Sequence, residues 1–303
     1  MAKLQGTFTA LVTPMFGDGS IDYEGFRKLV QNQIKAGVSG LVPLGTTAET
    51  PTLNEHDEEE KLIRIVIEEV QNAKQTSKRE IPIIMGAGSN NTRDAVYYVE
   101  RAKKFGADYA LVVTPYYNKP SQEGIFRHFE AVSKVGIPII VYNIKGRTGT
   151  NISTPLLKRI AELPNIAGVK EASGDIGQMM DVIAEIKNKK PDFVVLSGDD
   201  SLTFPLVAAG GDGVISVVAN IAPELMVKMT NAALKNDIVE ARKIHYRLLP
   251  FFKAAFCDGN PTSIKYALKT KGMLSTDAVR LPLVEVTEEA KKTIEVAIKK
   301  CEL

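Results

Sequence analysis

Cysteine is scarce in this 303-residue chain, which has only Cys257 and Cys301 and no CxxC pair. A disulfide framework is therefore not expected, and two isolated thiols are typical of a reducing compartment. Long hydrophobic runs are also lacking, since none approaches the roughly 20 residues that a membrane-spanning helix requires. The first residues, MAKLQGTFTALVTP, lack the apolar core of a signal peptide and the composition of a transit peptide. We expect a soluble, cytoplasmic protein without a membrane partner.

An excess of charge of one sign is absent as well. The 38 basic and 36 acidic side chains leave a formal net charge of +2, so no nucleic-acid partner is predicted. Histidine is rare, and His56, His128 and His245 all lie in charged, helical segments, where packing or solvated roles are more common than metal ligation. No Walker motif or dinucleotide fingerprint occurs. We therefore expect neither a metal nor another cofactor.

Short apolar runs rich in Val, Ile and Leu recur along the chain and alternate with amphipathic segments. The runs are residues 8–14, 39–45, 81–88, 109–115, 137–143, 166–170, 193–199 and 213–219. Such runs are typical of parallel strands that are covered on both faces. The segments between them place apolar residues at helical spacing, and several end at a glycine that suits a C-terminal cap, namely Gly37, Gly106 and Gly136.

Eight strand–helix couplets predict an α/β fold, a closed (β/α)8 TIM barrel, rather than an open doubly wound sheet. The open sheet would favour a GxGxxG turn after the first strand, where this chain has TPMFGDGSID with only Gly17 and Gly19. The remaining chain has helical patterns alone. We expect a catalytic barrel over residues 1–232 and an all-helical C-terminal domain over 233–303.

Active sites of such barrels lie at the C-terminal ends of the strands. Lys170 ends the run IAGVK, and alternation along the strand would place it on the interior face with Gly168 and Ile166. Tyr142 is the last but one residue of the preceding run and would face the same way. An amine walled by apolar residues has a lowered pKa, and its neutral form can attack a carbonyl to form a Schiff base.

A Schiff-base mechanism also needs a proton shuttle beside the amine. Tyr142, with Thr46 and Tyr117 as neighbours in a hydroxyl chain, is the candidate. The alternative is structural: a lysine at a strand end is often paired or snorkelling, with Glu171 as the adjacent carboxylate, and a tyrosine is often core. The gathering of these residues at strand ends on one face favours chemistry.

Several motifs together resemble one family, the dihydrodipicolinate synthases of the pyruvate-dependent class I aldolase and lyase superfamily, which includes N-acetylneuraminate lyase. The resemblance extends almost from end to end. It rests on GTTAETPTLN (45–54), VTPYYNKPSQEG (113–124), YNIKGRTG (142–149), GVKEASGD (168–175), LSGDD (196–200), GVISVVAN (213–220), NPTSIKYAL (260–268) and RLPLVEVT (280–287).

The resemblance implies a lyase that condenses pyruvate with L-aspartate 4-semialdehyde through a lysine Schiff base. The product would be 4-hydroxy-tetrahydrodipicolinate, in diaminopimelate and lysine biosynthesis. The resemblance implies that Lys170 forms the Schiff base and that Tyr142 donates and accepts protons, with Thr46 and Tyr117 completing the proton relay. It also implies that Thr47 binds the pyruvate carboxylate, that the Ile215 main chain lies against pyruvate, and that Arg147 binds the semialdehyde carboxylate. A homotetramer built as a dimer of dimers is also implied, with Tyr117 entering from a neighbouring subunit.

Two other functions stay open at this point. One is a class I retro-aldol lyase acting on N-acetylneuraminate or a 2-keto-3-deoxy sugar acid, and the other is a keto-acid sensor or scaffold without turnover. Arg147 argues for the synthase, because its planar guanidinium suits a carboxylate and the sugar-acid lyases usually lack an arginine in this motif. By itself it could be an exposed loop arginine.

The chain departs from the family pattern at two places. Ile144-Lys145-Gly146 stands where the family often has Val-Pro-Ser. In lysine-inhibited members a feedback site follows the GTT motif, and Glu55 and Glu58 stand here where those members have histidines. The possible site comprises Thr50, Glu55, Glu58, Asn90, Asp94 and Tyr116. We expect reduced sensitivity to lysine.

Overall fold

Eight parallel strands form one sheet in the computed structural model, which describes residues 4–303. The strands are β1 (Gly6–Ala10), β2 (Gly40–Val42), β3 (Ile84–Gly86), β4 (Tyr109–Val113), β5 (Ile139–Asn143), β6 (Ile166–Glu171), β7 (Val194–Ser197) and β8 (Gly213–Ser216). Their order is β2-β1-β8-β7-β6-β5-β4-β3. The fold predicted from the alternating pattern, a TIM barrel, is confirmed.

Helices follow the strands along the chain and also make up its C-terminal region. They are α1 (Tyr23–Ala36), α2 (Glu58–Ser77), α3 (Thr92–Phe105), α4 (Gln122–Ser133), α5 (Lys145–Thr148), α6 (Thr154–Ala161), α7 (Ile176–Val182), α8 (Thr203–Ala208), α9 (Pro223–Leu234), α10 (Ile238–Ala254), α11 (Thr262–Thr270) and α12 (Glu288–Cys301). A π-helical turn, Ile183–Lys187, continues α7. The predicted helical C-terminal segment is therefore present.

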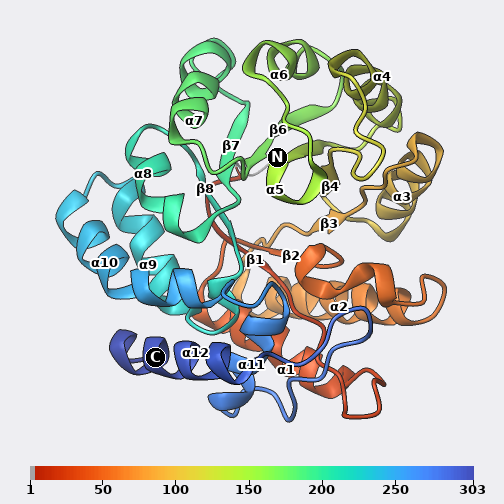
Figure 1. The fold of residues 1–303 in the computed structure, drawn as a ribbon. Helices are drawn as coiled ribbons and strands as arrows, with labels where there is room; N and C mark the ends of the chain where they lie inside the picture. The colour runs from red at the N-terminus through yellow and green to blue at the C-terminus, as the bar shows by residue number, and fades with distance from the viewer. Residues whose placement is uncertain (1–3) are drawn as a thin grey trace. The chain divides into compact units, whose positions relative to one another are not determined.

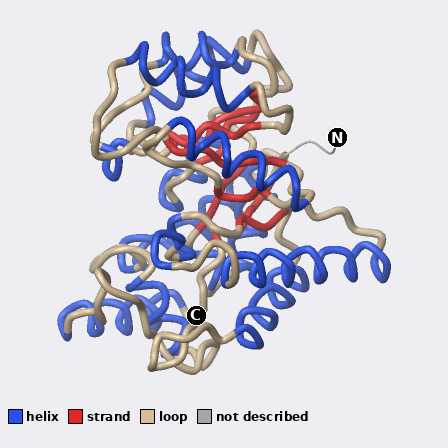
Figure 2. Tube along the Cα trace, turned by 90° about the vertical axis from the view of Figure 1, so that its right-hand side faces the viewer, coloured by secondary structure: helices blue, strands red, loops and turns tan. Residues whose placement is uncertain are grey.

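The chain divides into two compact units, and the first comprises residues 4–6 and 82–215. Strands β3 to β8 pair in parallel with their chain neighbours in this unit. Helices α3, α4, α6 and α7 lie outside these strands (Figure 1), and Figure 2 shows the same layering from the side. Fully buried side chains such as Val99, Phe129, Leu157 and Met179 face the strands from these helices. Burial on both faces explains why the strands are almost wholly apolar.

The second unit comprises residues 7–81 and 216–303. Strands β1 and β2 pair in parallel, with Phe8 opposite Gly40, and α1 packs on α2. Helix α10 packs against both α9 and α12. The expected domain boundary at residue 232 falls inside α9, and an independent helical domain over 233–303 stays a prediction.

Helix ends follow the expected glycines at two of three positions. Gly37 and Gly106 cap α1 and α3 in the left-handed region, with φ of 92° and 80°. There a residue without a Cβ avoids a clash with its own carbonyl. Helix α4 instead ends at Ser133 with Lys134 as its cap, and Gly136 lies in the left-handed region two residues later. Helix α4 thus ends before Gly136, the glycine that was expected to cap it.

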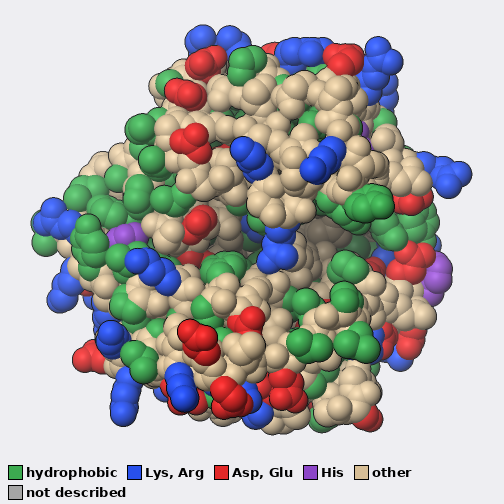
Figure 3. Space-filling model, in the orientation of Figure 1, with side chains coloured by type: hydrophobic (Ala, Val, Ile, Leu, Met, Phe, Trp, Pro, Cys, Tyr) green, Lys and Arg blue, Asp and Glu red, His purple; other side chains and the backbone are tan. Residues whose placement is uncertain are grey.

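Basic and acidic side chains are interspersed on the face drawn in Figure 3, as the near balance of charge predicts. Within residues 4–303, every helix is too short or too polar to cross a bilayer.

Candidate active site

The centre of the candidate site is a pair of residues on neighbouring strands. Tyr142 of β5 and Lys170 of β6 are register partners, and the following pair is Asn143 and Glu171. Because alternate residues of a strand face opposite sides, Tyr142 and Lys170 share one face and Asn143 and Glu171 share the other. The Lys170 Nζ atom lies 4.1 Å from the centroid of the Tyr142 ring. The predicted neighbourhood of these two side chains is confirmed.

Burial decides the protonation of Lys170. Its side chain is 6% exposed, and desolvation lowers the pKa of the amine from 10.5 to about 7. The Asp200 carboxylate opposes this by raising the pKa of Lys170, while the Arg147 guanidinium lowers it further. Among residues 4–303, no carboxylate lies within salt-bridge distance of the amine, so pairing with Glu171 does not hold it. The lysine is therefore half neutral near pH 7, as a nucleophile requires.

A glycine makes the room for the stem of this lysine. A Cβ on Gly198, just after β7, would lie 3.0 Å from Cε and 3.1 Å from Cγ of Lys170. A Cβ on Gly168 would instead lie 2.3 Å from the carbonyl oxygen of Val194. Gly168 thus permits the close approach of β7, and Gly198 leaves space for the lysine stem.

Tyr142 is a neutral phenol that can pass protons. Burial raises its pKa to about 12, and the positive charge of Arg147 works against that rise. Its carbonyl accepts hydrogen bonds from the backbone N–H of Thr114, at 3.1 Å, and from the Thr114 hydroxyl, at 3.2 Å. These bonds join the ends of β4 and β5 and fix the backbone from which the phenol projects.

Arg147 lies in the single helical turn α5, which follows β5. The residue is exposed, and its charge is nevertheless felt by both Lys170 and Tyr142. Helix α5 ends at Gly149 in the left-handed region, and the Thr148 hydroxyl donates to the carbonyls of Ile144 and Thr150. Arg147 thus sits on a short, internally bonded turn beside the lysine.

A buried carboxylate on the opposite face of β6 anchors the chain that follows α5. Glu171 is fully buried, and its carboxylate accepts hydrogen bonds from Asn143 Nδ2, the Ser173 backbone N–H and Gln178 Nε2. Burial raises the pKa of Glu171, and these donors oppose the rise. Asn143 Nδ2 also donates to Asn151 Oδ1 at 2.9 Å.

Further hydrogen bonds connect the segment that leaves α5 to the partners of Glu171. Asn151 Nδ2 donates to Gln178 Oε1 at 2.8 Å, and the Ile152 backbone N–H donates to Asn143 Oδ1 at 3.0 Å. Glu171 therefore joins β5, β6 and α7 to the segment that leaves α5. Sequence reasoning considered Glu171 only as a partner for Lys170, and the network could not be read from spacing alone.

Tyr117 does not belong to this buried group within the single chain. Its side chain is 89% exposed and its φ is 73°, in a turn where Asn118 donates to the carbonyls of Tyr116 and Asn90. A non-glycine residue in the left-handed region is uncommon and needs its surroundings to hold it there. The expected relay role of Tyr117 stays a prediction.

The structure places the other candidates of the first unit as follows. Ile215 is buried in β8, whose backbone continues the parallel sheet. Asp200 begins the turn after β7 and is buried, and its carboxylate acts on the pKa of Lys170. From the sequence, Asp200 was named only within the motif LSGDD and was given no role. Two consecutive acids at that strand end were the available signal.

Thr46 and Thr47 lie in the second unit, in the 3-10 turn Thr46–Ala48 after β2. Thr46 is exposed and Thr47 is buried. Asn260 Nδ2 donates to the Thr47 hydroxyl at 3.0 Å, and the Thr13 hydroxyl donates to the Ala48 carbonyl at 2.8 Å. Because a hydroxyl that accepts one bond keeps its own proton, Thr47 retains a donor for a further acceptor such as a carboxylate.

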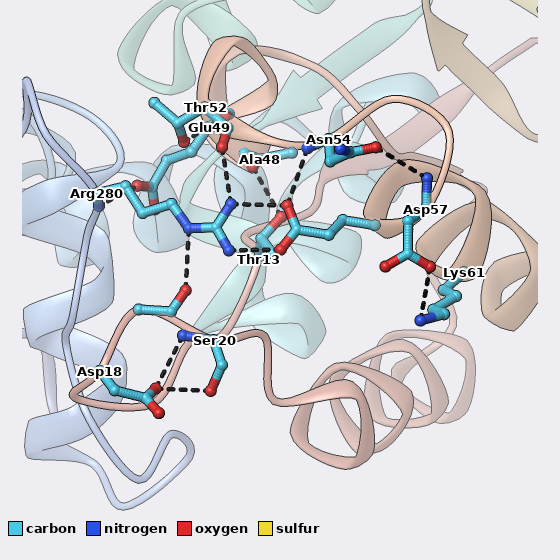
Figure 4. A network of polar contacts seen from close by, with 12 residues as sticks. Thr13, Asp18, Ser20, Ala48, Glu49, Thr52, Asn54, Asp57, Lys61 and Arg280 are labelled. Atoms are coloured by element: carbon cyan, nitrogen blue, oxygen red, sulfur yellow. Dashed lines mark hydrogen bonds and ion pairs between the residues drawn. The ribbon is translucent and has the colours of Figure 1, made fainter.

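Two cations from the C-terminal region hold the chain that follows Thr47. Lys265 Nζ donates to Glu49 Oε1 at 2.7 Å, and both side chains are 0% exposed. The Arg280 guanidinium donates to both carboxylate oxygens of Glu58, at 2.6 and 2.7 Å (Figure 4). Arg280 lowers the pKa of Glu58.

The residues of the possible lysine site are placed in both units. In the second, Glu58 is bound by Arg280, Glu55 Oε1 lies 3.0 Å from His56 Nε2, and the Thr50 hydroxyl donates to the Gly45 carbonyl. In the first, Asp94 lies 3.8 Å from Arg93, while Asn90 and Tyr116 bracket the turn described above. Residues 4–303 contain no group of three or more His, Cys, Asp or Glu that could hold a metal ion.

Comparison with known proteins finds the same family at the level of sequence and structure. The model of the dihydrodipicolinate synthetase family matches residues 3–301. The 4-hydroxy-tetrahydrodipicolinate synthase of Protochlamydia amoebophila is 49% identical over 286 residues, which are 94% of this chain and 92% of that protein.

Two solved structures extend the similarity to the fold. Dihydrodipicolinate synthase of Thermotoga maritima superposes with a TM-score of 0.93 at 42% identity, covering 99% of each chain. The chloride-inhibited dihydrodipicolinate synthase of Acinetobacter baumannii, solved in complex with pyruvate, gives a TM-score of 0.92 at 37% identity, again covering 99% of each chain.

Proposed function

The chain belongs to the dihydrodipicolinate synthetase family, and we propose that it condenses pyruvate with L-aspartate 4-semialdehyde to 4-hydroxy-tetrahydrodipicolinate. It is a lyase of diaminopimelate and lysine biosynthesis. The observation that carries the proposal is the buried amine of Lys170, whose pKa is about 7 and which lies 4.1 Å from the ring centroid of Tyr142. An ordinary surface lysine would be protonated and unreactive at the same pH.

Lys170 is the nucleophile in this mechanism. Its neutral amine forms a bond to the keto carbon of pyruvate, and the former carbonyl oxygen leaves as water after accepting protons. Loss of a methyl proton from the resulting iminium gives an enamine, whose carbon forms the new bond to the aldehyde carbon of the semialdehyde. The former aldehyde oxygen takes up a proton and becomes the 4-hydroxyl group. The amino group of the semialdehyde then attacks the iminium carbon and closes the ring, and the bond from that carbon to Lys170 breaks to release the free amine. The related Acinetobacter baumannii enzyme was solved in complex with pyruvate, which supports pyruvate as the first substrate.

Tyr142 donates and accepts the protons of these steps. With a pKa of about 12, the phenol stays protonated and serves as a relay rather than a standing base. We assign Thr46 and Tyr117 to the remainder of the relay, Thr47 to the pyruvate carboxylate and the Ile215 main chain to the pyruvate. These assignments are supported by the family motifs, and for Thr47 also by the hydroxyl proton that the bond from Asn260 leaves available.

Arg147 is assigned to the carboxylate of the semialdehyde. Its exposed position on the turn after β5, with its charge acting on Lys170 and Tyr142, supports a place beside the reacting atoms. A guanidinium binds a carboxylate through two parallel hydrogen bonds. The same residue would disfavour a long neutral sugar chain as the second partner.

We further propose a cytoplasmic homotetramer, a dimer of dimers in which Tyr117 reaches a neighbouring subunit. Tyr117 is 89% exposed in the single chain, whereas a tyrosine in a proton relay is surrounded by hydrogen-bonding groups. This supports a neighbouring subunit as the source of those groups. We also propose reduced inhibition by lysine. The Glu58 carboxylate is already bound at both oxygens by Arg280, which leaves it little capacity to bind an ammonium group.

Borohydride trapping with pyruvate tests the proposed function. The expected result is a reduced adduct on the peptide that contains Lys170, no adduct with Lys170→Ala, and turnover with aspartate semialdehyde measured by a coupled assay. An adduct on another lysine would contradict the mechanism. Turnover of N-acetylneuraminate or a keto-deoxy sugar acid in place of the semialdehyde would point to a retro-aldol lyase, and no adduct at all to a non-catalytic sensor.

A further inference from the structure

The turn that carries Thr46 and Thr47 has a backbone that its own sequence does not favour. Glu49 joins the 3-10 turn Thr46–Ala48 to a second one, Thr50–Thr52, with φ of 58° and ψ of 32°. A residue with a Cβ is disfavoured in this left-handed region because the Cβ crowds the following carbonyl. Such a conformation persists only where surrounding contacts determine it.

Those contacts come from the C-terminal region. Lys265 of α11 donates to one carboxylate oxygen of Glu49 at 2.7 Å, and the Arg280 backbone N–H donates to the other at 3.1 Å. Both charged side chains of the ion pair are completely buried. Within the turn, the Glu49 carbonyl accepts from the backbone N–H and the hydroxyl of Thr52. Glu49 is thus held at both its side chain and its carbonyl.

Arg280 fastens the second 3-10 turn by its side chain. Its guanidinium donates to the Thr52 carbonyl, as Figure 4 shows, and also to the Glu58 carboxylate and the Gly19 carbonyl. Asn260, at the start of the chain that forms α11, adds the bond to the Thr47 hydroxyl. Three C-terminal residues therefore bind one stretch of about a dozen residues after β2, each through a directional bond.

Stability alone is a poor reason to bury this ion pair. Replacing a buried pair by apolar side chains of similar volume is often neutral or stabilising, and in some proteins a buried polar pair instead selects one conformation. Here the ion pair holds Glu49 in its strained conformation, and Thr47 lies two residues before Glu49. We propose that Lys265 and Glu49 are positioning residues, which hold the Thr46–Thr47 turn in the shape that binds the carboxylate of a 2-keto acid substrate.

This inference rests on the proposed function for the identity of the ligand, and the test separates the two. Lys265→Met removes the cation, and Lys269→Met is the matched control. Lys269 lies on the same helix and donates to Asp277 at 2.8 Å, without touching the turn. Two quantities are measured for each variant: the pyruvate concentration that gives half-maximal borohydride trapping, and the amide hydrogen exchange of a peptide covering residues 45–53.

The expected result for Lys265→Met is a half-maximal pyruvate concentration raised roughly tenfold or more, because small displacements of a binding group are costly. Faster exchange of the 45–53 amides should accompany it, since the Glu49, Thr52 and Leu53 N–H groups are bonded within the turn. Lys269→Met should match the parent protein in both. The inference is overturned if Lys265→Met shows the parent's exchange in 45–53 together with the parent's pyruvate dependence.

A second variant covers the case in which the lone Glu49 charge prevents folding. Glu49→Gln/Lys265→Met removes both charges and keeps an acceptor for the Arg280 N–H. If this chain has the parent's Tm and still needs more pyruvate, the pair positions the turn; if it also has the parent's pyruvate dependence, the pair is structural only and the inference is wrong. Absence of any adduct in the parent protein would defeat the proposed function. In that case the exchange of 45–53 still decides whether the pair holds the turn.

Discussion

Tyr142 and Lys170 are register partners on β5 and β6, and the lysine amine lies 4.1 Å from the tyrosine ring centroid. The ring covers one side of the amine and contributes to the burial that lowers the pKa of Lys170. The same arrangement leaves the phenol, with its raised pKa, next to the atoms that must exchange protons. Burial at this place thus sets the protonation of both groups, and the Arg147 charge lowers the pKa of each.

The pH dependence of trapping should report the lowered pKa of Lys170. The neutral fraction of an amine with a pKa of about 7 rises about tenfold between pH 6 and pH 8 and then levels off. The initial rate of borohydride trapping at low pyruvate should follow that curve. Asp200→Asn should shift the midpoint to lower pH and Arg147→Ala to higher pH, because these charges act on Lys170 with opposite signs. A rate that still climbs steeply beyond pH 9 would mean an ordinary, solvated lysine.

Gly198→Ala should impair the Schiff base without unfolding the protein. The added methyl group would lie 3.0 Å from Lys170 Cε and 2.6 Å from the Ala172 Cβ, so the lysine stem has to move. Overpacking of this kind costs roughly 1–3 kcal/mol. We expect a lower trapping rate, measured as adduct formed per minute, with a modest loss of Tm. Gly17→Ala is the control, since no atom of residues 4–303 lies within 4 Å of a Cβ there. Equal trapping by both variants would show that Gly198 does not shape the lysine's position.

Arg147→Ala should separate the two substrates. Pyruvate trapping on Lys170 should persist, while the KM for aspartate semialdehyde rises by roughly two orders of magnitude, since a charged hydrogen-bonded pair is lost. Arg147→Lys should recover only part of the loss, because an ammonium lacks the planar pair of donors. The coupled assay over a range of semialdehyde concentrations measures both. An unchanged KM in the Ala variant would place the second carboxylate elsewhere.

Glu171→Gln should loosen the segment that follows Arg147. The carboxylate accepts hydrogen bonds from Asn143, Ser173 and Gln178. A glutamine amide cannot accept all three, because only its oxygen accepts and its nitrogen is a donor. Hydrogen bonds to a buried charge contribute about 1.5–3 kcal/mol each, so a lower Tm is expected. The KM for the semialdehyde should rise more than that for pyruvate. Glu185→Gln, on the π-helical turn after α7, is the exposed control. A loss of Tm with both KM values unchanged would limit Glu171 to a structural role.

The sequence was sufficient for much of the fold because burial leaves a periodic trace. Eight apolar runs were placed within a few residues of the observed strands, and the helical patterns expected after residue 232 correspond to α10, α11 and α12. Strand ends were less accurate, as the first strand begins at Gly6 instead of residue 8. The helix expected to reach Gly136 ends at Ser133. End positions depend on caps and neighbours, which a local pattern does not contain.

The candidate site, like the fold, could be predicted from the sequence only in part. Alternation along β6 and the place of Tyr142 at the end of β5 were enough to predict their pairing and the lowered pKa of Lys170, because both follow from strand periodicity and burial. The hydrogen-bond partners of Glu49, Glu58 and Glu171 could not be predicted from strand periodicity. Lys265 is 216 residues from Glu49 and Arg280 is 222 residues from Glu58, and only packing brings them together. Periodicity shows which face a residue takes, whereas the identity of its partner depends on distances between elements that the chain's local pattern does not encode.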